Sequence, residues 1–516
     1  MILSSGNSNT AVQNYLSPEK IIPPLFLGLF FFIFVLLNIL VGYFLVDFYS
    51  LFAVAALIIT EMLNILIAYR LSEFIVSVLF QATPLPRLEN LSGYPRVAIL
   101  YMTYNDVMPE VLDRIRNLDY PDYKVFVLDD STSGACRDVI DAQGYQVVRR
   151  SHRKGFKAGA INHWLSLYGK DFPYFLILDS DSIVDQDFIG EILRYAEHPD
   201  NTRIAVFQSK WRIWNTKNRF PRLVASLYPI WFFSFERLAN AYSTPLIMGH
   251  NNLLRTDAIR EVGGFDEDYV CEDLAISLKL LEQGYEVKYV DLVTFESCPE
   301  TAAAYAKRNI RWGNGTIEVA RKGTRKIPYI GNFHLFMTTF SYLIYLVYLP
   351  GMFVVTWGFT SSFGDAALLL YLILTGKILL MPVFIPLLLI FVYVFIFYFL
   401  RLPLALKLHV SLKDYFLGLL VIPAVDFYML IPMIYGMLKT IGGEKVHFNV
   451  TSKEILTPSL LRVFRTMGIM TLIWVLLIIG VLRNPVSFIF NFFWLIPFIG
   501  TPFIIYWIEK NPVPGS

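Results

Sequence analysis

The chain has 516 residues, of which 55% are apolar, 16% aromatic and only 17% charged. A water-soluble domain carries about 25% charged residues, so the chain as a whole is too apolar to be freely soluble. Its net charge of +2 excludes a nucleic-acid-binding protein that relies on a large basic surface. The three cysteines, Cys136, Cys271 and Cys298, have no C-x-x-C spacing, which argues against a zinc site or a disulfide scaffold.

Two long apolar segments open the chain. Ile21–Val46 is almost uninterrupted Leu, Ile, Phe and Val, and it is long enough to cross a hydrocarbon core of about 30 Å. The second runs from Phe48 to Ala68 and contains Glu61, which needs a partner or a polar cavity at membrane depth. The first twenty residues lack a basic segment, so a secretory signal is not expected. Residues 1–81 are therefore predicted to hold two transmembrane helices.

Residues 82–328 have the composition of a water-soluble domain, and a proline-containing linker precedes it. Six β-rich segments are predicted as strands: Arg96–Tyr104, Tyr123–Asp130, Tyr145–Val148, Tyr174–Asp181, Ile204–Lys210 and Glu286–Val290. Three helical patterns lie between them: Val107–Leu118, Ala158–Tyr168 and Phe188–Ala196. This alternation predicts an open α/β sheet that binds its ligand at the carboxyl ends of the strands.

Apolar segments return in residues 329–516. Four are predicted to span the membrane: His334–Val355, Leu379–Leu400, Val463–Leu482 and Phe488–Ile508. Ser411–Leu438 is also apolar, but two prolines and Asp426 interrupt it, so it is either a span or a helix in the membrane interface. With the two N-terminal helices, the preferred total is six spans.

The basic residues predict the orientation. They cluster in two C-terminal connections and include Arg401, Lys407, Lys439, Lys445, Lys453, Arg462 and Arg465. Because cytoplasmic loops are enriched in Lys and Arg, these connections and the α/β domain are placed in the cytoplasm. The expected protein is a multi-pass protein of the plasma membrane.

Carboxylates follow two of the predicted strands. Asp129 and Asp130 end one, and Asp179-Ser180-Asp181 ends another. In an open sheet these ends converge, and two carboxylates two residues apart suit a divalent cation that neutralises a diphosphate leaving group. Asp and Ser also favour turns for local hydrogen-bonding reasons, which is the alternative interpretation.

A third acidic site, Cys271-Glu272-Asp273, opens a helical segment. Asp273 either caps that helix or acts as the general base toward an acceptor hydroxyl. Cys271 has no partner pattern and is interpreted as a packing residue. Further on, Ser297, Pro299 and Glu300 predict the start of another helix.

That helix carries Arg308, Arg311 and Trp312 on one face. A tryptophan beside two arginines suits a sugar ring stacked on the indole and a diphosphate held by guanidinium groups. An aromatic and basic stripe at the lipid headgroups would have the same pattern. The positions alone leave both interpretations open.

Together these segments resemble the membrane-embedded family 2 glycosyltransferases, which include cellulose, chitin and hyaluronan synthases and ceramide glucosyltransferase. The motifs that carry the resemblance occur in the family's order: Tyr104-Asn105-Asp106, Asp129-Asp130-Ser131, Lys157 to Asn162, Asp179-Ser180-Asp181, Cys271-Glu272-Asp273 and Arg308-x-x-Arg311-Trp312. In addition, Phe448, Val450, Thr451 and Lys453 resemble the F-x-V-T-x-K gating loop of cellulose synthases, here near residues 444–456.

The resemblance implies a GT-A α/β domain, residues 82–328, inserted in an all-α transmembrane bundle with about six spans and interfacial helices. It implies nucleotide-sugar binding by Tyr104, Asp106, Asp129, Asp130, Lys157, Asp179 and Arg311. It further implies Mg²⁺ or Mn²⁺ on Asp179 and Asp181, and Glu272 and Asp273 as the catalytic carboxylates, with Asp273 the base. Trp312 and Arg308 would contact the acceptor sugar. The reaction would invert the anomeric centre and form a β-glycoside.

Two residues depart from the family pattern. Cys271 replaces the usual Thr or Gly, and Arg308 replaces the usual Gln, which resembles ceramide glucosyltransferases. The leading hypothesis is a processive polysaccharide synthase that uses a nucleotide sugar, expected to be a UDP-sugar, and passes its product across the membrane. An accessory export subunit is a candidate partner, which the sequence does not itself indicate. The alternatives are transfer of one sugar to a lipid acceptor and an inactive scaffold or transporter. The expected partners are the donor, a growing glycan or lipid acceptor and membrane lipids, with no nucleic acid.

Overall fold

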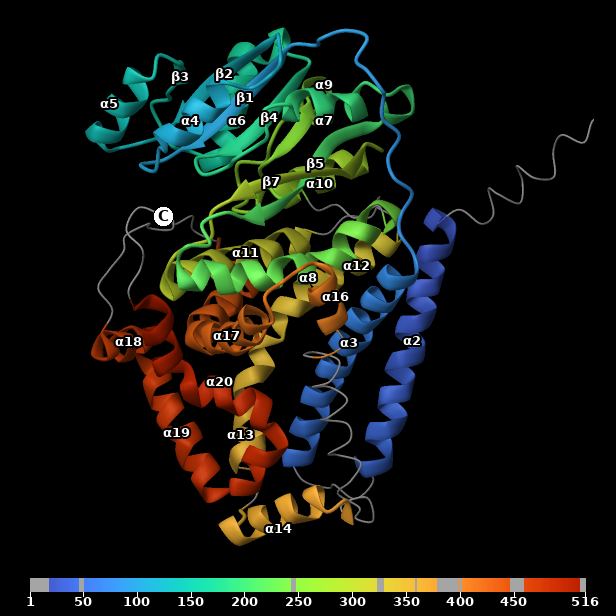
Figure 1. Ribbon diagram of the computed structural model, residues 1–516, viewed down its shortest axis with the longest axis vertical. Coiled ribbons are helices and arrows are strands. Elements are labelled where there is room, and N and C mark those ends of the chain that lie inside the picture. The colour runs from blue at the N-terminus through green and yellow to red at the C-terminus, as the bar shows by residue number, and fades with distance from the viewer. Residues whose placement is uncertain are drawn as a thin grey trace, which may run out of the picture.

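The computed structural model of the protein describes residues 18–45, 51–242, 247–322, 329–357, 360–377, 399, 401–445 and 459–510. Figure 1 shows two regions: a sheet with its covering helices at one end, and a group of long helices at the other. The chain enters the sheet after its first two helices and leaves it for the remaining helices. This order agrees with the predicted insertion of an α/β domain into a helical bundle.

The sheet has seven strands in the order β3-β2-β1-β4-β6-β5-β7. Their bounds are β1 (Val97–Thr103), β2 (Tyr123–Asp129), β3 (Gln146–Val148), β4 (Tyr174–Asp179), β5 (Ile204–Ile213), β6 (Asn252–Arg255) and β7 (Glu286–Glu296). The six predicted strands are confirmed, and β6 is an unpredicted seventh that runs antiparallel between β4 and β5. Thr103 of β1 pairs with Asp129, and Met102 with Asp179, so β1, β2 and β4 end level at one edge.

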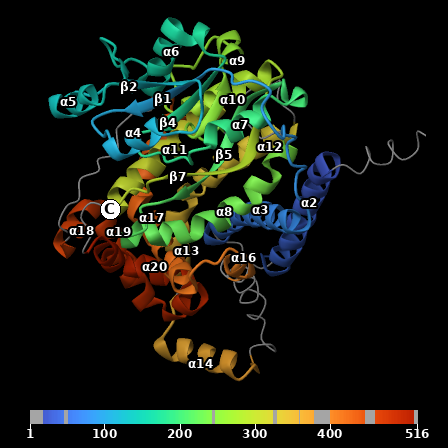
Figure 2. The same cartoon turned by 45° about the horizontal axis from the view of Figure 1, so that its top comes forward.

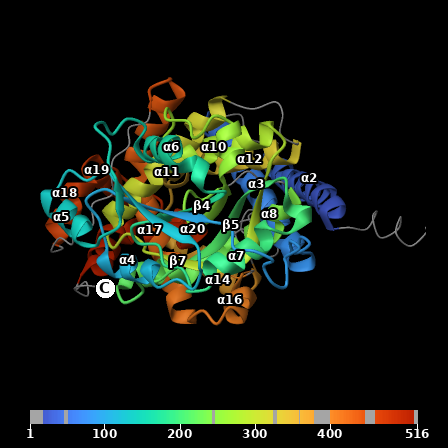
Figure 3. The same cartoon turned by 90° about the horizontal axis from the view of Figure 1, so that it is seen from above.

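Helices cover both faces of the sheet, and Figure 3 shows them on either side of the strands. One face carries α4 (Pro109–Arg116) and α7 (Phe188–Ala196), and the other carries α6 (Phe156–Tyr168), α9 (Thr256–Glu261) and α10 (Glu272–Glu282). The alternating side chains of the strands make one apolar core with each set. The domain also contains α5 (Gly134–Ala142) and the short 3₁₀ turns Gly169–Asp171 and Pro199–Asn201.

Three helices separate the sheet from the long helices in Figure 1: α8 (Arg219–Tyr242), α11 (Ala302–Lys322) and α17 (Leu412–Ile441). They pack closely, since a Cβ atom added to Gly436 of α17 would lie 2.2 Å from Asn314 Nδ2 of α11. Sequence analysis did not predict α8. It packs its apolar side, including Phe220 and Leu227, into the same core as α17 and α20 (Pro485–Glu509).

The remaining helices complete the helical part of the molecule. They are α2 (Pro18–Leu45), α3 (Leu51–Leu79), α12 (Tyr329–Leu343), α13 (Tyr345–Trp357), α14 (Phe363–Leu374), α16 (Leu402–Lys407), α18 (Leu460–Met467) and α19 (Ile469–Arg483). Figure 2 shows α14 at the end of the molecule opposite the sheet.

Within the described residues, four helices are long and apolar enough to cross a membrane: Pro18–Ile39, Thr60–Leu79, Tyr329–Val347 and Leu412–Ile441. A fifth is counted if α18 and α19, which meet at a bend of 98°, form one span. The expected count of six stays a prediction, because Leu379–Leu400 lies outside the described residues apart from Phe399. The structure differs from expectation at His334–Val355, which breaks into α12 and α13. Ser411–Leu438 was expected to be a span or an interfacial helix, and it belongs to the single helix α17, which Ser411 caps.

Candidate active site

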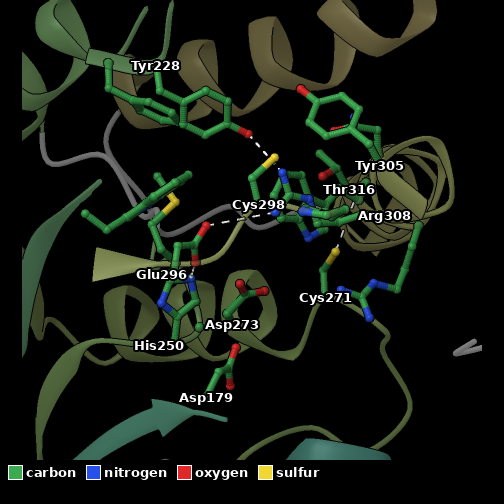
Figure 4. Close-up of a pocket in the computed structure, with 18 of the residues that line it drawn as sticks. Asp179, Tyr228, His250, Cys271, Asp273, Glu296, Cys298, Tyr305, Arg308 and Thr316 are labelled. Atoms are coloured by element: carbon green, nitrogen blue, oxygen red, sulfur yellow. Dashed lines mark hydrogen bonds and ion pairs between the residues drawn. The ribbon is translucent and has the colours of Figure 1, made fainter. Parts of the chain in front are cut away.

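A cavity of about 990 Å³ lies against the carboxyl ends of β1, β2 and β4 and extends to α8, α11, α3 and α12. Most of the predicted site residues line it: Tyr104, Asp106, Asp130, Lys157, Asp179, Asp181, Glu272, Asp273, Arg308, Arg311 and Trp312. Figure 4 shows Asp179 and Asp273 on the side of the sheet, with Arg308 across from them. Asp129 is not among the lining residues, and the predicted gating-loop residues, Phe448, Val450, Thr451 and Lys453, lie outside the described residues.

Asp106 joins the loops that follow β1 and β4. Its Oδ1 accepts hydrogen bonds from the Thr103 hydroxyl at 3.0 Å and the Tyr104 backbone N–H at 2.8 Å. Its Oδ2 accepts one from the Ser180 hydroxyl at 2.7 Å. These three bonds fix the carboxylate at the point where the two strand ends meet.

The guanidinium group of Arg153 lies over the ring of Tyr104. The Arg153 guanidinium lies 3.5 Å from the ring centroid, a cation–π contact at the wall of the cavity. No motif of the sequence analysis contained Arg153. Arg153 lies in the loop before α6, and the fold brings this loop to the end of β1, where the sequence alone does not place it.

Asp129 and Asp130 are held by two arginines from the segment after β3. Arg149 Nε donates to Asp129 Oδ2 at 2.7 Å, and the Asp129 side chain is fully buried. Arg150 binds both oxygens of Asp130, at 2.9 and 2.6 Å. Asp129 therefore holds the segment after β3 through Arg149 and does not line the cavity, whereas Asp130 does line it.

Lys157, at the start of α6, forms an ion pair with Asp179. Burial by itself lowers the pKa of Lys157, but Asp179 and Glu272 nearby hold it above its ordinary value. Burial likewise raises the pKa of Asp179, yet Lys157 and His250 hold it below its ordinary value. Both groups are therefore charged at neutral pH.

The donor set at the end of β4 fits a divalent cation that arrives with its substrate. Asp179 and Asp181 both line the cavity, and the Ser297 hydroxyl donates to Asp181. The described residues contain no group of three or more His, Cys, Asp or Glu placed to hold a metal. Mg²⁺ and Mn²⁺ are commonly bound by one or two carboxylates together with substrate phosphates and water. Two carboxylates are sufficient for such an ion, which would neutralise a diphosphate.

Glu272 and Asp273 form the first turn of α10 and face the cavity. Asp273 Oδ1 accepts a hydrogen bond from the Leu274 backbone N–H at 2.8 Å. Burial and the adjacent Asp273 charge raise the pKa of Glu272 to about 7. Burial also raises the pKa of Asp273. Raised pKa values of this kind suit carboxylates that accept a proton near neutral pH.

Gly249 makes room for the Asp273 carboxylate. Its φ is +76°, and a Cβ atom there would lie 2.9 Å from Asp273 Oδ2. Gly249→Ala is expected to destabilise the fold by about 1–2 kcal/mol, the strain of a left-handed residue, and to displace Asp273 so that activity falls. Gly263→Ala is the matched control, because Gly263 has a φ of +79° with nothing within 4 Å of its Cβ position.

Melting temperatures and initial rates of both variants check this prediction. Similar destabilisation is expected in the two proteins, with loss of activity confined to Gly249→Ala. Equal activity in both variants would contradict the close approach of Gly249 to Asp273.

Two further residues, His250 and Glu296, connect the cavity carboxylates to α11. His250 Nε2 lies 2.8 Å from Glu296 Oε2, and Glu296 Oε1 lies 3.9 Å from Arg308 Nη1. Burial lowers the pKa of His250, but the Glu296 carboxylate raises it to about 9. Arg308 also donates to the Tyr228 hydroxyl at 3.1 Å. Figure 4 shows Glu296 between His250 and Arg308. His250 and Glu296 lie in none of the sequence motifs described above, so the motifs do not predict them.

Arg308, Arg311 and Trp312 all line the cavity from α11, as their spacing predicts. The Arg308 guanidinium lies 4.6 Å from the Trp312 ring centroid, so it stacks on the indole. Cys271 is buried and its thiol lies 3.9 Å from the Trp312 backbone oxygen. This agrees with its interpretation as a packing residue.

The predicted start of this helix at Ser297 is wrong. α11 begins at Ala302, and the Ala304 N–H donates to the Thr301 hydroxyl at 3.2 Å, so Thr301 caps it. Ser297 instead donates to Asp181 across the cavity. The sequence alone does not distinguish a Ser that caps a helix from a Ser that binds a distant carboxylate. Here the hydrogen bond to Asp181 determines the role of Ser297.

Comparisons with known proteins agree with this arrangement. Residues 174–402 match the family model described as glycosyl transferase family group 2. Glucomannan 4-beta-mannosyltransferase 1 of Cyamopsis tetragonoloba is 26% identical over 278 residues, 49% of this chain and 52% of that protein. The poly-beta-1,6-N-acetyl-D-glucosamine synthase of Staphylococcus aureus (strain MSSA476) is 26% identical over 269 residues, 50% of this chain and 64% of that protein. The chain thus spans only about half to two thirds of these relatives' length.

The solved mannosyltransferase of Pyrobaculum calidifontis, in complex with GDP-Man and Mn²⁺, shares the fold with a TM-score of 0.50 and 17% identity. It covers 76% of this chain, and 99% of that chain is matched. The mixed sheet is therefore GT-A-like. The family match over residues 174–402, the relatives and the acidic site agree with the resemblance found in the sequence: the chain carries a family 2 glycosyltransferase domain.

Proposed function

We propose that the chain is a processive, inverting glycosyltransferase that makes a β-linked polysaccharide from a nucleotide sugar, a UDP-sugar, and passes it across the membrane. The observation that carries the proposal is the continuity of the cavity. One volume contains the strand-end carboxylates, the Arg308 and Trp312 face of α11, and residues of α3 and α12. A growing chain in such a cavity stays beside the donor after each transfer.

In this proposal the donor lies at the strand ends. Tyr104, Asp106 and Asp130 contact the nucleoside, while Lys157 and Arg311 bind the diphosphate. Asp179 and Asp181 would hold a divalent cation, which would neutralise charge on the diphosphate leaving group. Asp129 supports the donor site indirectly through Arg149. Asp273 takes the proton from the acceptor hydroxyl as that oxygen bonds to the anomeric carbon opposite the departing diphosphate, which inverts the configuration.

The acceptor lies on α11. Trp312 offers its indole face to a sugar ring, and Arg308, which stacks on that indole, fixes its orientation. We also propose that Phe448, Val450, Thr451 and Lys453 act as a gating loop over the bound donor. The catalytic domain is placed on the cytoplasmic side, where nucleotide sugars are available, and an accessory subunit carries the product onward.

Product size tests the proposal. Purified protein in liposomes is given labelled UDP-glucose, UDP-N-acetylglucosamine, UDP-galactose or GDP-mannose with Mg²⁺ or Mn²⁺. One donor is expected to yield a long polymer that a β-specific glycosidase degrades. A chloroform-soluble monoglycosyl lipid as the sole product would contradict processivity and establish the second candidate.

That second candidate is transfer of one sugar to a lipid. The residues with which α3 lines the cavity favour this second candidate. They form one apolar face: Leu63, Leu66, Ile67, Leu71 and Phe74. A hydrocarbon chain fits such a face, whereas a glycan is matched by the aromatic and polar residues of α11.

A further inference from the structure

The end of the cavity farthest from the strands lies between two candidate membrane spans. α3 contributes its apolar face, and α12 contributes His334, Thr338 and Ser341, which share one face at helical spacing. Both helices overlap segments that are apolar enough to cross a membrane, Thr60–Leu79 and Tyr329–Val347. The cavity therefore extends to two helices that are apolar enough to cross a membrane.

Positive charge is in excess at this end. Among the described residues that α3, α12 and the segment before α16 bring to the cavity, Arg70 and Arg401 are cations and Glu73 is the one carboxylate. Arg70 Nη1 binds Glu73 Oε2 at 2.9 Å, and the Glu73 side chain is 5% exposed. The Glu73 carboxylate is therefore already paired with Arg70 and does not neutralise Arg401.

Arg401 is left without a partner in the described parts of the chain. No hydrogen bond or ion pair of its guanidinium group occurs there, although its charge interacts with those of Arg70 and Glu73. A partly buried guanidinium beside apolar helices needs a counter-charge, because it has lost much of its hydration. A planar guanidinium binds phosphate oxygens well, often through two hydrogen bonds.

We propose that Arg401 and Arg70 bind the phosphate group of a lipid whose hydrocarbon chains lie along the Leu63, Leu66 and Ile67 face of α3. The lipid is either a phospholipid of the bilayer or a lipid-linked phosphate that serves as acceptor. The chemistry that recognises it is the same: an anionic phosphate joined to a long apolar chain. The inference depends on the proposed function only for the membrane position of this end of the cavity.

Lipid retention measures the site without sugar transfer. The full chain, purified in detergent, is mixed with phosphatidylglycerol, undecaprenyl phosphate or phosphate-free digalactosyldiacylglycerol, and bound lipid is counted by native mass spectrometry. Arg401→Gln and Arg70→Gln are expected to lower retention of the phosphate lipids at least about fivefold, and Arg401→Lys is expected to retain most of it, because it keeps the charge. Arg465→Gln, on the exposed side of α18, is the matched control and is expected to bind like the wild type. An unchanged melting temperature shows that a variant is folded.

The arms of the experiment distinguish the two lipids. Preference for undecaprenyl phosphate, with a glycosylated product after addition of a nucleotide sugar, identifies an acceptor. Preference for phosphatidylglycerol that is never glycosylated identifies a resident lipid. Equal retention by the wild type and Arg401→Gln, or equal binding of digalactosyldiacylglycerol by the wild type, would overturn the inference. A failure of polymer synthesis alone leaves this lipid result unaffected.

Discussion

Asp273→Asn is expected to lower turnover by a factor of about 10² or more, the usual scale for loss of a general base, while donor affinity changes little. The substitution keeps the size of the side chain and its hydrogen bond from the Leu274 N–H, but an amide cannot accept the proton of the acceptor hydroxyl. The measurement is kcat for sugar transfer together with the dissociation constant of the nucleotide sugar.

Glu282→Gln is the control for this prediction, since it removes a carboxylate at the other end of α10, outside the cavity. Its turnover is expected to match that of the wild type. Turnover of Asp273→Asn within a factor of two of the wild type would remove Asp273 from the role of base.

The pH profile gives the same prediction a second readout. Burial and mutual repulsion raise the pKa of Glu272 to about 7, and burial raises that of Asp273. A group with a raised pKa takes up its proton as the pH falls through the raised value, and a protonated base is inactive. Wild-type kcat is therefore expected to decline as the pH falls through the pKa of Asp273, which burial raises above that of an ordinary aspartate. Asp273→Asn should lose this acidic limb.

Local sequence signals were sufficient where an element depends mainly on its own residues. The strands that end at Asp129 and Asp179 are apolar runs bounded by turn residues, and the structure has them within a few residues of expectation. β6 escaped prediction because it has only four residues and runs antiparallel between longer strands, so its pairing partners define it. α8 was not predicted, because the residues that bury its apolar face belong to α17 and α20, which are distant in sequence.

The candidate site shows the same division. The motifs predicted which residues gather at the strand ends, because parallel strands bring their carboxyl ends together. They did not predict how charges pair there. Asp129 does not line the cavity, because it binds Arg149 from the segment after β3. His250 lies in the site, where it binds Glu296 at the end of β7. Such pairs depend on the register of the sheet and on loop paths, which no single segment contains.

Removal of divalent cations with EDTA is expected to reduce sugar transfer to background, and Mn²⁺ or Mg²⁺ is expected to restore it. The reason lies in the balance of charge at the strand ends. Six carboxylates line the donor end of the cavity: Asp106, Asp130, Asp179, Asp181, Glu272 and Asp273. Lys157 is already paired with Asp179 and Arg150 with Asp130, so the charge of Asp181 beside them would oppose an incoming diphosphate. A cation held by Asp179 and Asp181 would offset that repulsion.

A matched pair of variants makes the assignment specific. Asp181→Asn removes one expected ligand and should raise the Mn²⁺ concentration for half-maximal activity at least about tenfold. Asp185→Asn, an exposed position four residues further on, should leave that concentration unchanged. Full activity in EDTA, or equal Mn²⁺ dependence of the two variants, would contradict a metal on Asp179 and Asp181. Neutralisation of the diphosphate would then fall to Lys157 and Arg311, which both line the cavity.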